Sequence, residues 1–231
     1  MVSWNKGLTK QTSPSLLKTS QTMKFRGLDN FSMWRKKMKE SGKIKDSYPS
    51  FVKGGNLAEL MGVVLGDGHI WKYPRTEELS IFSNANNSGF VERYSNLVYK
   101  VFNKNPTVKK HSGENCIRIR IYEKNISKRL GVPVSPRKDK KIIVPNWILK
   151  DNRYIFRYLR GLYEAEGSYS VHKETYTYKF LFSNKNESML ENVYFLLNKI
   201  GFHPHLGTDK IQISRKDEVV SLMELIKFRK Y

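Results

Sequence analysis

The sequence predicts an α+β protein made of two similar halves, each with the element order αββαββα, around a parallel pair of helices. The first observation is a repeated stretch, since residues 60–68 read LMGVVLGDG and residues 159–167 read LRGLYEAEG. The second is that helical and alternating hydrophobic patterns follow both copies in the same order. The third is the spacing: the copies begin 99 residues apart (159 − 60), and the triplet Phe-Ser-Asn at 82–84 recurs 100 residues later (182 − 82). The repeat therefore spans a whole structural unit.

A helix is predicted over the first copy of this stretch. Its apolar residues recur at helical spacing and would form one face: Leu57, Leu60, Met61, Val64 and Leu65. Asn56 can act as the N-cap of this helix, which places Glu59 at the third position of a capping box. Asp151 or Asn152 can cap the helix over the second copy.

Small residues line a neighbouring stripe of each predicted helix. In the first copy they recur every fourth residue, at Ala58, Gly62 and Gly66, and the second copy has Gly161 and Ala165. Because glycine within a soluble helix costs about 1 kcal/mol relative to alanine, such a stripe needs a packing reason. We expect the two helices to pack in parallel along it.

Both predicted helices end at an acidic residue followed by glycine, at Asp67-Gly68 and Glu166-Gly167. Glycine is suited to the position that ends a helix, and an ordinary helix-to-strand turn would explain either copy taken alone. Parallel packing, however, would bring both carboxylates to the same end of the helix pair. Two carboxylates there repel unless they are protonated or bridged by a cation, and hard divalent cations prefer such oxygen ligands.

At these residues the sequence resembles the single-chain, two-motif LAGLIDADG homing endonucleases. The resemblance rests on the two motif copies and on the sequence LGDGHI at residues 65–70. It implies that Asp67 and Glu166 are the metal-binding catalytic residues, that the divalent ion is normally Mg²⁺, and that two curved four-stranded sheets form a saddle over DNA. The sequence departs from the family pattern in having Glu166 where Asp is commoner, and Leu65 where the second copy keeps the acid Glu164.

The same resemblance implies a lysine near the start of the third helix of each half, where it would polarise water or stabilise the transition state. Lys124 and Lys216 occupy matching places, 92 residues apart (216 − 124). A solvated lysine would explain each of them equally, and Arg215 lies beside the second. Both are candidate catalytic residues on this basis.

The chain has 231 residues and a formal net charge of +21. Such an excess indicates a polyanionic partner, and nucleic acid is favoured over a merely basic surface. Cys116 is the only cysteine, so the chain has no internal disulfide and no Cys-based zinc site. No apolar run approaches the roughly 20 residues of a membrane helix, and residues 1–30 lack the hydrophobic core of a signal peptide. We expect a cytoplasmic or nucleoid-associated protein without membrane contact, while the basic, Ser/Thr-rich start leaves an organellar location open.

Residues 1–53 form a basic N-terminal arm, with twelve Lys or Arg against three acidic residues. Two pieces of it, at 4–9 and 25–29, lead into Gly-Leu and then a capping residue, and they resemble the NUMOD-type modules that accompany homing-endonuclease cores. The second piece would continue as a helix through residues 33–39. A disordered basic tail is the alternative. The resemblance implies DNA contacts outside the cleavage site, and the candidates are Lys6, Arg26, Arg35 and Lys36.

The predicted domains are this arm, a first half with its connector at residues 54–150, and a second half at residues 151–231. Two hairpins follow each motif helix, and one strand, at 116–122, alternates most cleanly, with isoleucines on one face and Arg118 and Arg120 on the other. Arginine can donate two hydrogen bonds to guanine in the major groove, and a β-ribbon fits into that groove. Contacts to phosphate groups would explain the presence of both arginines equally. The further candidate DNA-contacting residues are Trp71, Lys72, Lys109, Lys173, Lys179, Lys210 and Gln212.

These features lead to one expected function and two alternatives. We expect a monomeric, Mg²⁺-dependent endonuclease that makes a double-strand break in a long, pseudo-palindromic double-stranded DNA target. The alternatives on the same fold are an intron-RNA maturase and a DNA-binding regulator without cleavage. The presence of both Asp67 and Glu166 argues against the regulator and does not bear on the maturase.

Overall fold

The structure is a computed structural model, and it describes residues 6–29, 31–42, 45, 47–110 and 114–231. The chain falls into two compact units, residues 1–48 and residues 49–231. The predicted arm, which ends at residue 53, runs slightly beyond the first unit.

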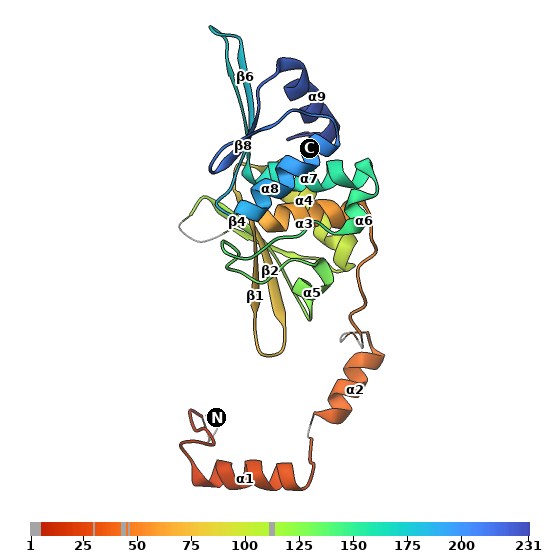
Figure 1. Ribbon diagram of the computed structural model, residues 1–231. Helices are drawn as coiled ribbons and strands as arrows, with labels where there is room; N and C mark the ends of the chain where they lie inside the picture. Colours follow the sequence, from red (N-terminus) through yellow and green to blue (C-terminus); the bar gives the residue numbers. More distant parts are fainter. Residues whose placement is uncertain (1–5, 30, 43–44, 46, 111–113) are drawn as a thin grey trace. The chain divides into compact units, whose positions relative to one another are not determined.

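The described residues of the first unit include the helices α1 (Pro14–Phe25) and α2 (Ser32–Glu40), near the red end of the colour bar in Figure 1. Pro14 opens α1, at a position where its missing N–H would have no partner within the helix. α2 covers the helix predicted at residues 33–39. Neither helix buries a residue among those that the structure describes. Trp4 and Asn5, which begin the first NUMOD-like piece, lie outside the described residues.

The second unit contains the element order αββαββα twice, as the sequence predicts. The first half consists of α3 (Gly55–Gly66), β1 (Gly68–Lys72), β2 (Glu77–Asn84), α4 (Ser88–Phe102), β3 (Thr107–Lys110), β4 (Cys116–Glu123) and α5 (Ile126–Leu130). The second half follows the short helix α6 (Asn146–Leu149) and consists of α7 (Asn152–Glu166), β5 (Gly167–His172), β6 (Thr177–Ser183), α8 (Glu187–Lys199), β7 (His205–Leu206), β8 (Lys210–Ile213) and α9 (Lys216–Ile226). Residues 111–113, between β3 and β4, lie outside the described residues.

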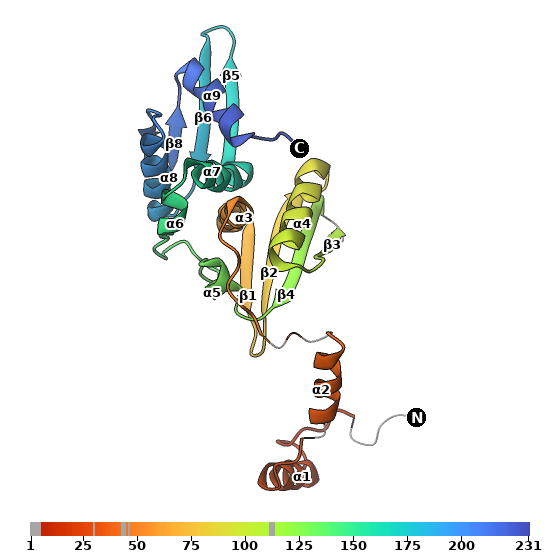
Figure 2. The ribbon, with the colours of Figure 1, turned by 90° about the vertical axis from the view of Figure 1, so that its right-hand side faces the viewer.

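Each half forms a four-stranded antiparallel sheet with the same strand order, β1-β2-β4-β3 in the first half and β5-β6-β8-β7 in the second. Figures 1 and 2 show α3 and α7 side by side between the two sheets. The alternation of β4 buries Ile119 and Ile121, and that of β8 buries Ile211 and Ile213, in one hydrophobic core that both halves share. Among the described residues, no helix is both long enough and apolar enough to cross a membrane.

α3 and α7 pack with their backbones in contact along the predicted stripe of small residues. A Cβ atom added to Gly62 would lie 2.9 Å from the backbone nitrogen of Leu162, and closer still to the carbonyl oxygen of Tyr158. A Cβ atom added to Gly161 would lie 2.6 Å from the backbone nitrogen of Val63. Glycine is therefore required at both positions, and the residues that weaken an isolated helix are those that let the two helices meet.

The start of α3 differs from the prediction. The helix begins two residues earlier, with Gly54 at the N-cap and no side-chain cap, so Asn56 is not the N-cap and no capping box forms. Asn56 instead accepts a hydrogen bond from Arg157 at 2.9 Å, and Glu59 is fully buried. The physical reason is that Arg157 of α7 binds both side chains and Arg93 of α4 also binds Glu59, so neither side chain is available to cap the helix. The predicted cap of α7 is confirmed, because the Asp151 side chain accepts a hydrogen bond from the backbone N–H of Arg153.

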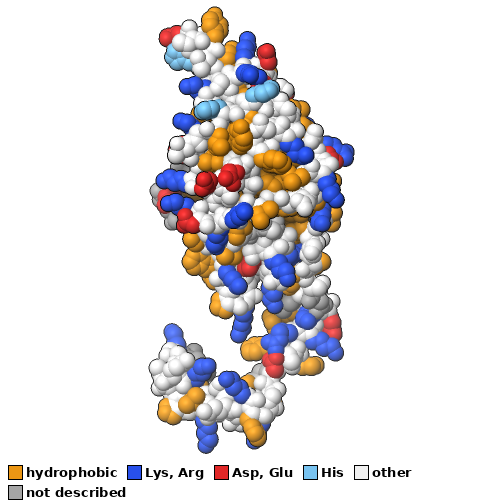
Figure 3. Space-filling model, viewed as in Figure 1, with side chains coloured by type: hydrophobic (Ala, Val, Ile, Leu, Met, Phe, Trp, Pro, Cys, Tyr) orange, Lys and Arg blue, Asp and Glu red, His pale blue; other side chains and the backbone are white. Residues whose placement is uncertain are grey.

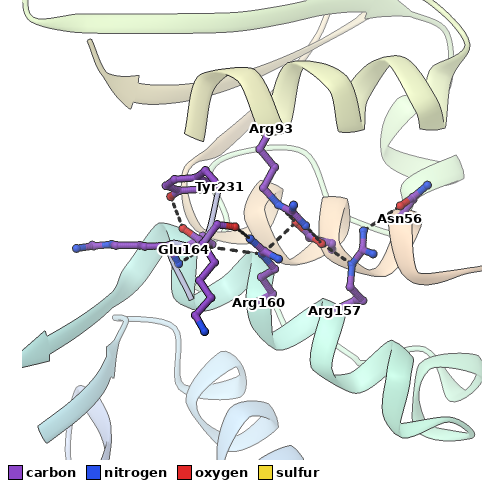
Figure 4. Close-up of polar contacts among 9 residues, drawn as sticks. Asn56, Arg93, Arg157, Arg160, Glu164 and Tyr231 are labelled. Carbon is purple, nitrogen blue, oxygen red and sulfur yellow. Dashed lines mark hydrogen bonds and ion pairs between the residues drawn. The ribbon is translucent and has the colours of Figure 1, made fainter. Parts of the chain in front are cut away.

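A buried ionic network joins α3, α4 and α7 (Figure 4). The Glu59 carboxylate accepts hydrogen bonds from Arg93 Nε at 2.6 Å and Arg93 Nη2 at 2.8 Å, and it is also paired with Arg157. Arg160 Nε lies 3.6 Å from Glu59 Oε1 and 3.7 Å from Glu164 Oε1. Because a buried charge that loses its partner is strongly destabilising, this network holds the three helices in one arrangement.

Candidate active site and nucleic-acid interface

Asp67 and Glu166 lie side by side at the C-terminal ends of α3 and α7. Asp67 directly follows α3, and Glu166 is the last residue of α7. The helix ends are close because Gly66 faces α7: a Cβ atom added there would lie 3.0 Å from Cγ of Glu166 and would overlap the side chain of Ala165. The parallel helix pair therefore brings the two carboxylates together, as the sequence predicts.

The surroundings of this pair disfavour ionised carboxylates. Burial, together with the charge of Glu166, raises the pKa of Asp67 to about 7. Burial also raises the pKa of Glu166, although the hydrogen bond that Asn184 Nδ2 donates to its Oε1 at 3.3 Å acts in the opposite direction. A bound cation would relieve both effects, because it favours the charged form of each acid.

The donor set fits a hard divalent cation. Two adjacent carboxylates offer oxygen ligands, and Mg²⁺ is usually bound through one or two carboxylates together with waters and phosphate oxygens. In the part of the chain that the structure describes, no group of three or more His, Cys, Asp or Glu side chains is placed to hold a metal ion. The two carboxylates of Asp67 and Glu166 offer the oxygen ligands that the divalent ion implied by the resemblance prefers.

A cavity of about 490 Å³ opens beside Glu166. Its lining includes seven polar or charged residues that the sequence analysis did not select as candidates: Arg137, Lys138, Ser183, Asn184, Lys185, Asn186 and Asp209. Asn184 has a signal in the sequence, because it ends the repeated triplet Phe-Ser-Asn. Arg137 and Lys138 have none, since they lie in a Pro- and Lys-rich connector that only the tertiary structure brings to the helix ends.

The two candidate lysines lie away from the carboxylates. Lys124 follows β4 at the hairpin end of β2, whereas Asp67 lies beside Phe82 near the other end, roughly 17 Å away along the strand. Lys216 begins α9, and its Nζ lies 5.4 Å from the ring centroid of Tyr178. Tyr178 lies four residues along β6 from Phe182, the strand partner of Gly167, which follows Glu166. The catalytic roles of both lysines stay predictions that the geometry does not favour.

Comparisons with known proteins agree with this architecture. Residues 153–231 match the family model of the LAGLIDADG-like domain. Among solved structures, variants of the homing endonuclease I-DmoI match with a TM-score of 0.50 and 19% identity, over 74% of this chain and 94% of that chain. The fold is the two-repeat LAGLIDADG fold.

Two further structures with the LAGLIDADG fold contain DNA. I-DmoI in complex with DNA and Ca matches with a TM-score of 0.51 and 19% identity, over 74% of this chain and 88% of that chain. The I-LtrWI LAGLIDADG homing endonuclease bound to target DNA matches with a TM-score of 0.50 and 11% identity, over 75% of this chain and 84% of that chain. No curated protein sequence matches this chain.

Each sheet of the LAGLIDADG fold has one face toward the core and one open face. On the first sheet, Trp71, Lys109, Arg118 and Arg120 share the open face, because their register positions alternate with those of the buried isoleucines. Lys72 alternates with Trp71 along β1, so it lies on the opposite face of the strand, and it is exposed at the strand end. Four of these five candidates therefore lie on the same face of the sheet.

The second sheet repeats this arrangement with fewer charges. Lys179, Lys210 and Gln212 share its open face, opposite the register of the buried phenylalanines and isoleucines. Lys173 is exposed in the turn that follows β5. Figure 3 shows Lys and Arg side chains spread over the visible face of residues 49–231.

In the first unit, the candidate DNA-contacting residues are all exposed. Lys6 lies in a turn before α1, Arg26 follows α1, and Arg35 and Lys36 lie on α2. Arg35 is paired with Asp29. A role of these residues in DNA binding and the NUMOD-like character of the segment stay predictions.

Proposed function

We propose that this protein is a site-specific DNA endonuclease that uses a divalent metal ion to cut both strands of a long, pseudo-palindromic target. The observation that carries the proposal is the pair Asp67 and Glu166, side by side at the ends of packed helices in a LAGLIDADG fold. The DNA-bound structures of I-DmoI and I-LtrWI support DNA as the partner. A net charge of +21 supports a polyanionic partner in general.

Asp67 and Glu166 would hold the metal ion, and Mg²⁺ is the ion that we propose. The structures of I-DmoI with DNA and either Ca or Mn support a divalent ion. When bound, such an ion would activate water and stabilise the charge that develops on the scissile phosphate. Because each half contributes one acid, we assign one acid to each DNA strand.

The chain's own side chains would position the reacting groups. Asn184 holds Oε1 of Glu166 by its hydrogen bond. Lys138 and Lys185 line the cavity beside Glu166, and ammonium groups are suitable partners for phosphate oxygens. We therefore propose these two lysines, rather than Lys124 and Lys216, as the basic residues that contact the phosphate.

The open faces of the two sheets would contact the DNA duplex on either side of the cleavage site. The first sheet presents Arg118 and Arg120, whereas the second presents Lys179 and Gln212 at its open face. Because the two faces differ, one chain would read two unlike half-sites, and we propose a monomer. Residues 1–48 would add DNA contacts outside the cleavage site.

A plasmid library with randomised inserts tests this proposal. We expect the purified protein to linearise a subset of plasmids in Mg²⁺, and the recovered cuts to share one long sequence. Asp67→Asn should abolish linearisation and still bind the recovered DNA in a gel-shift assay. Asp217→Asn, which changes an exposed acid in the first turn of α9, is the matched control and should cut like the wild type.

Two other results would redirect the assignment. A wild-type protein that binds DNA specifically but cuts none of the library in Mg²⁺ or Mn²⁺ would contradict the assignment as a nuclease. It would favour a DNA-binding regulator. Specific binding to a structured intron transcript, without binding to DNA, would point to a maturase instead.

A further inference from the structure

We propose that Arg137 is a positioning residue for Asp67, and that Arg229 is its counterpart for Glu166. The catalytic consequence of this proposal rests on the endonuclease function proposed above. Each arginine follows the helix that comes after the second hairpin of its half, α5 or α9. Each donates a hydrogen bond to the carbonyl oxygen of the glycine directly after its acid.

Arg137 contacts the chain on both sides of Asp67. Its Nη2 donates to the carbonyl oxygen of Val64 at 2.7 Å and to the carbonyl oxygen of Gly68. Val64 belongs to the last turn of α3, where carbonyl groups lack partners within the helix. The guanidinium group therefore bridges the end of α3 and the start of β1, with Asp67 between its two contacts.

The charge of Arg137 suits this position. The C-terminal end of a helix carries a partial negative charge, and the two carboxylates add to it here. The guanidinium group of Arg137 meets the partial charge of the helix end through its hydrogen bonds to backbone carbonyls, and it also donates to Ser135 Oγ at 2.9 Å. These contacts fix the helix end without engaging the oxygens that would bind a metal ion.

The second half holds the backbone that carries Arg137. Asn186 Nδ2 lies within hydrogen-bond distance of three carbonyl oxygens of the connector, those of Arg137 at 2.7 Å, Lys138 at 2.9 Å and Lys140 at 2.8 Å. Asn186 is itself buried, and its side chain caps α8. The connector thus ties the end of α3 to the second half, which fixes one acid relative to the other.

Arg229 makes the corresponding contact in the second half. Its Nη2 donates to the carbonyl oxygen of Gly167 at 3.4 Å, and its backbone N–H donates to Glu164 Oε1 at 2.7 Å. The same contact in both halves, from arginines 92 residues apart (229 − 137), indicates a requirement of the site. Arg137 makes the shorter bonds, so its loss should have the larger effect.

Hydrogen exchange in the protein without metal or DNA tests the positioning directly. Arg137→Met should speed amide exchange in the peptide 60–70 while the rest of the core stays protected, because the helix end opens locally. Lys104→Met is the matched control. Lys104 is also a basic residue of the first half whose side chain donates to a backbone carbonyl, that of Tyr122 at 2.8 Å, but it lies between α4 and β3, away from the acids. The control should leave exchange in 60–70 unchanged.

Cleavage kinetics test whether this positioning serves the reaction. On the target recovered from the library, Arg137→Met should lower kcat by about 10- to 100-fold, since small misplacements of reacting groups have effects of this size. The Kd for the same DNA in EDTA should stay within about twofold of the wild-type value, because the hydrogen bonds of Arg137 that the variant removes are made to the protein and not to DNA. Arg137→Lys should also lose activity, because lysine keeps the charge but cannot bridge two carbonyl groups in the same way.

The following outcomes decide between the positioning role and its absence. Unchanged exchange in 60–70 for Arg137→Met would overturn the positioning role, whether or not the wild type cuts DNA. Full activity of Arg137→Lys would also overturn it, because charge alone would then suffice. If Arg137→Met does not fold, Arg229→Met with exchange measured in 160–170 gives the same decision. A wild-type protein that cuts no DNA would contradict the proposed function. The exchange result would still decide the positioning role of Arg137, because that measurement needs neither metal nor DNA.

Discussion

Asp67 occupies a position that disfavours an ionised carboxylate while no metal is bound. Burial and the charge of Glu166 raise its pKa to about 7, from an ordinary value of 3.8. The folded protein therefore binds this proton more tightly than the unfolded chain does. As the pH rises from about 4 to about 7, the protein loses stability through this group, and above pH 7 the loss is complete.

We expect Asp67→Asn to be more stable than the wild type at pH 8 in EDTA, by about 2 to 4 kcal/mol, and equally stable at pH 4. The asparagine removes a charge that burial disfavours, and at pH 4 the folded wild type carries no such charge. Urea unfolding at the two pH values measures the difference. Glu174→Gln, at an exposed carboxylate, should change the stability at neither pH. An equal gain at both pH values would mean that ionisation of Asp67 is not its cause.

The element that decides the architecture is the packed pair α3 and α7. Glycines at the crossing let the two backbones touch, and Gly66 lets the ends approach until the acids are neighbours. Glu59 and its arginines add a buried ionic network beside the same interface. The pair is therefore both the centre of the core and the support of the candidate metal site.

Gly161→Ala should destabilise the protein by about 3 kcal/mol, as overpacking of a tight core does. The added methyl group would meet backbone atoms of α3, which cannot move aside as a flexible side chain can. Chemical denaturation measures this loss. Gly207→Ala is the matched control, because a Cβ atom there makes only ordinary contacts at 3.4 Å or more, and it should change stability by less than about 0.5 kcal/mol. Similar losses at both positions would argue against backbone packing at the crossing.

At the scale of the whole molecule, positive charge is distributed over two separate units. Residues 1–48 carry eleven Lys or Arg against three acidic residues, and they form one of the two compact units of the chain. A polyanion that contacts both units would release counterions from both. Salt dependence can therefore separate the contribution of the arm from that of the core.

Deletion of residues 1–48 should leave the melting temperature of the remaining protein unchanged and weaken DNA binding. The plot of log affinity against log salt should become shallower by about 0.9 for each phosphate contact that is lost. Filter binding over a range of salt concentrations measures both slopes. An unchanged slope would contradict the DNA-binding role of the arm, and a flat slope for the full-length protein would contradict DNA as the partner.

The sequence alone determined the order of elements, the two sheets and the acidic pair, because each of these depends on local spacing or on comparison of one half with the other. The alternation at Arg118 and Arg120 defined a strand with one open face, and the stripe through Gly62 and Gly66 defined the helix contact. These patterns are properties of neighbouring residues, and the structure confirms them.

Only the tertiary structure decided the surroundings of these elements. The local sequence predicted that Glu59 belongs to a capping box, but in the structure arginines from α4 and α7 bind its carboxylate instead. Arg137 reaches Val64 across 73 positions of the chain, and nothing in its own neighbourhood indicates that contact. The physical reason is that burial and charge pairing between distant segments outweigh local preferences, and such pairings form only when the two halves pack against each other.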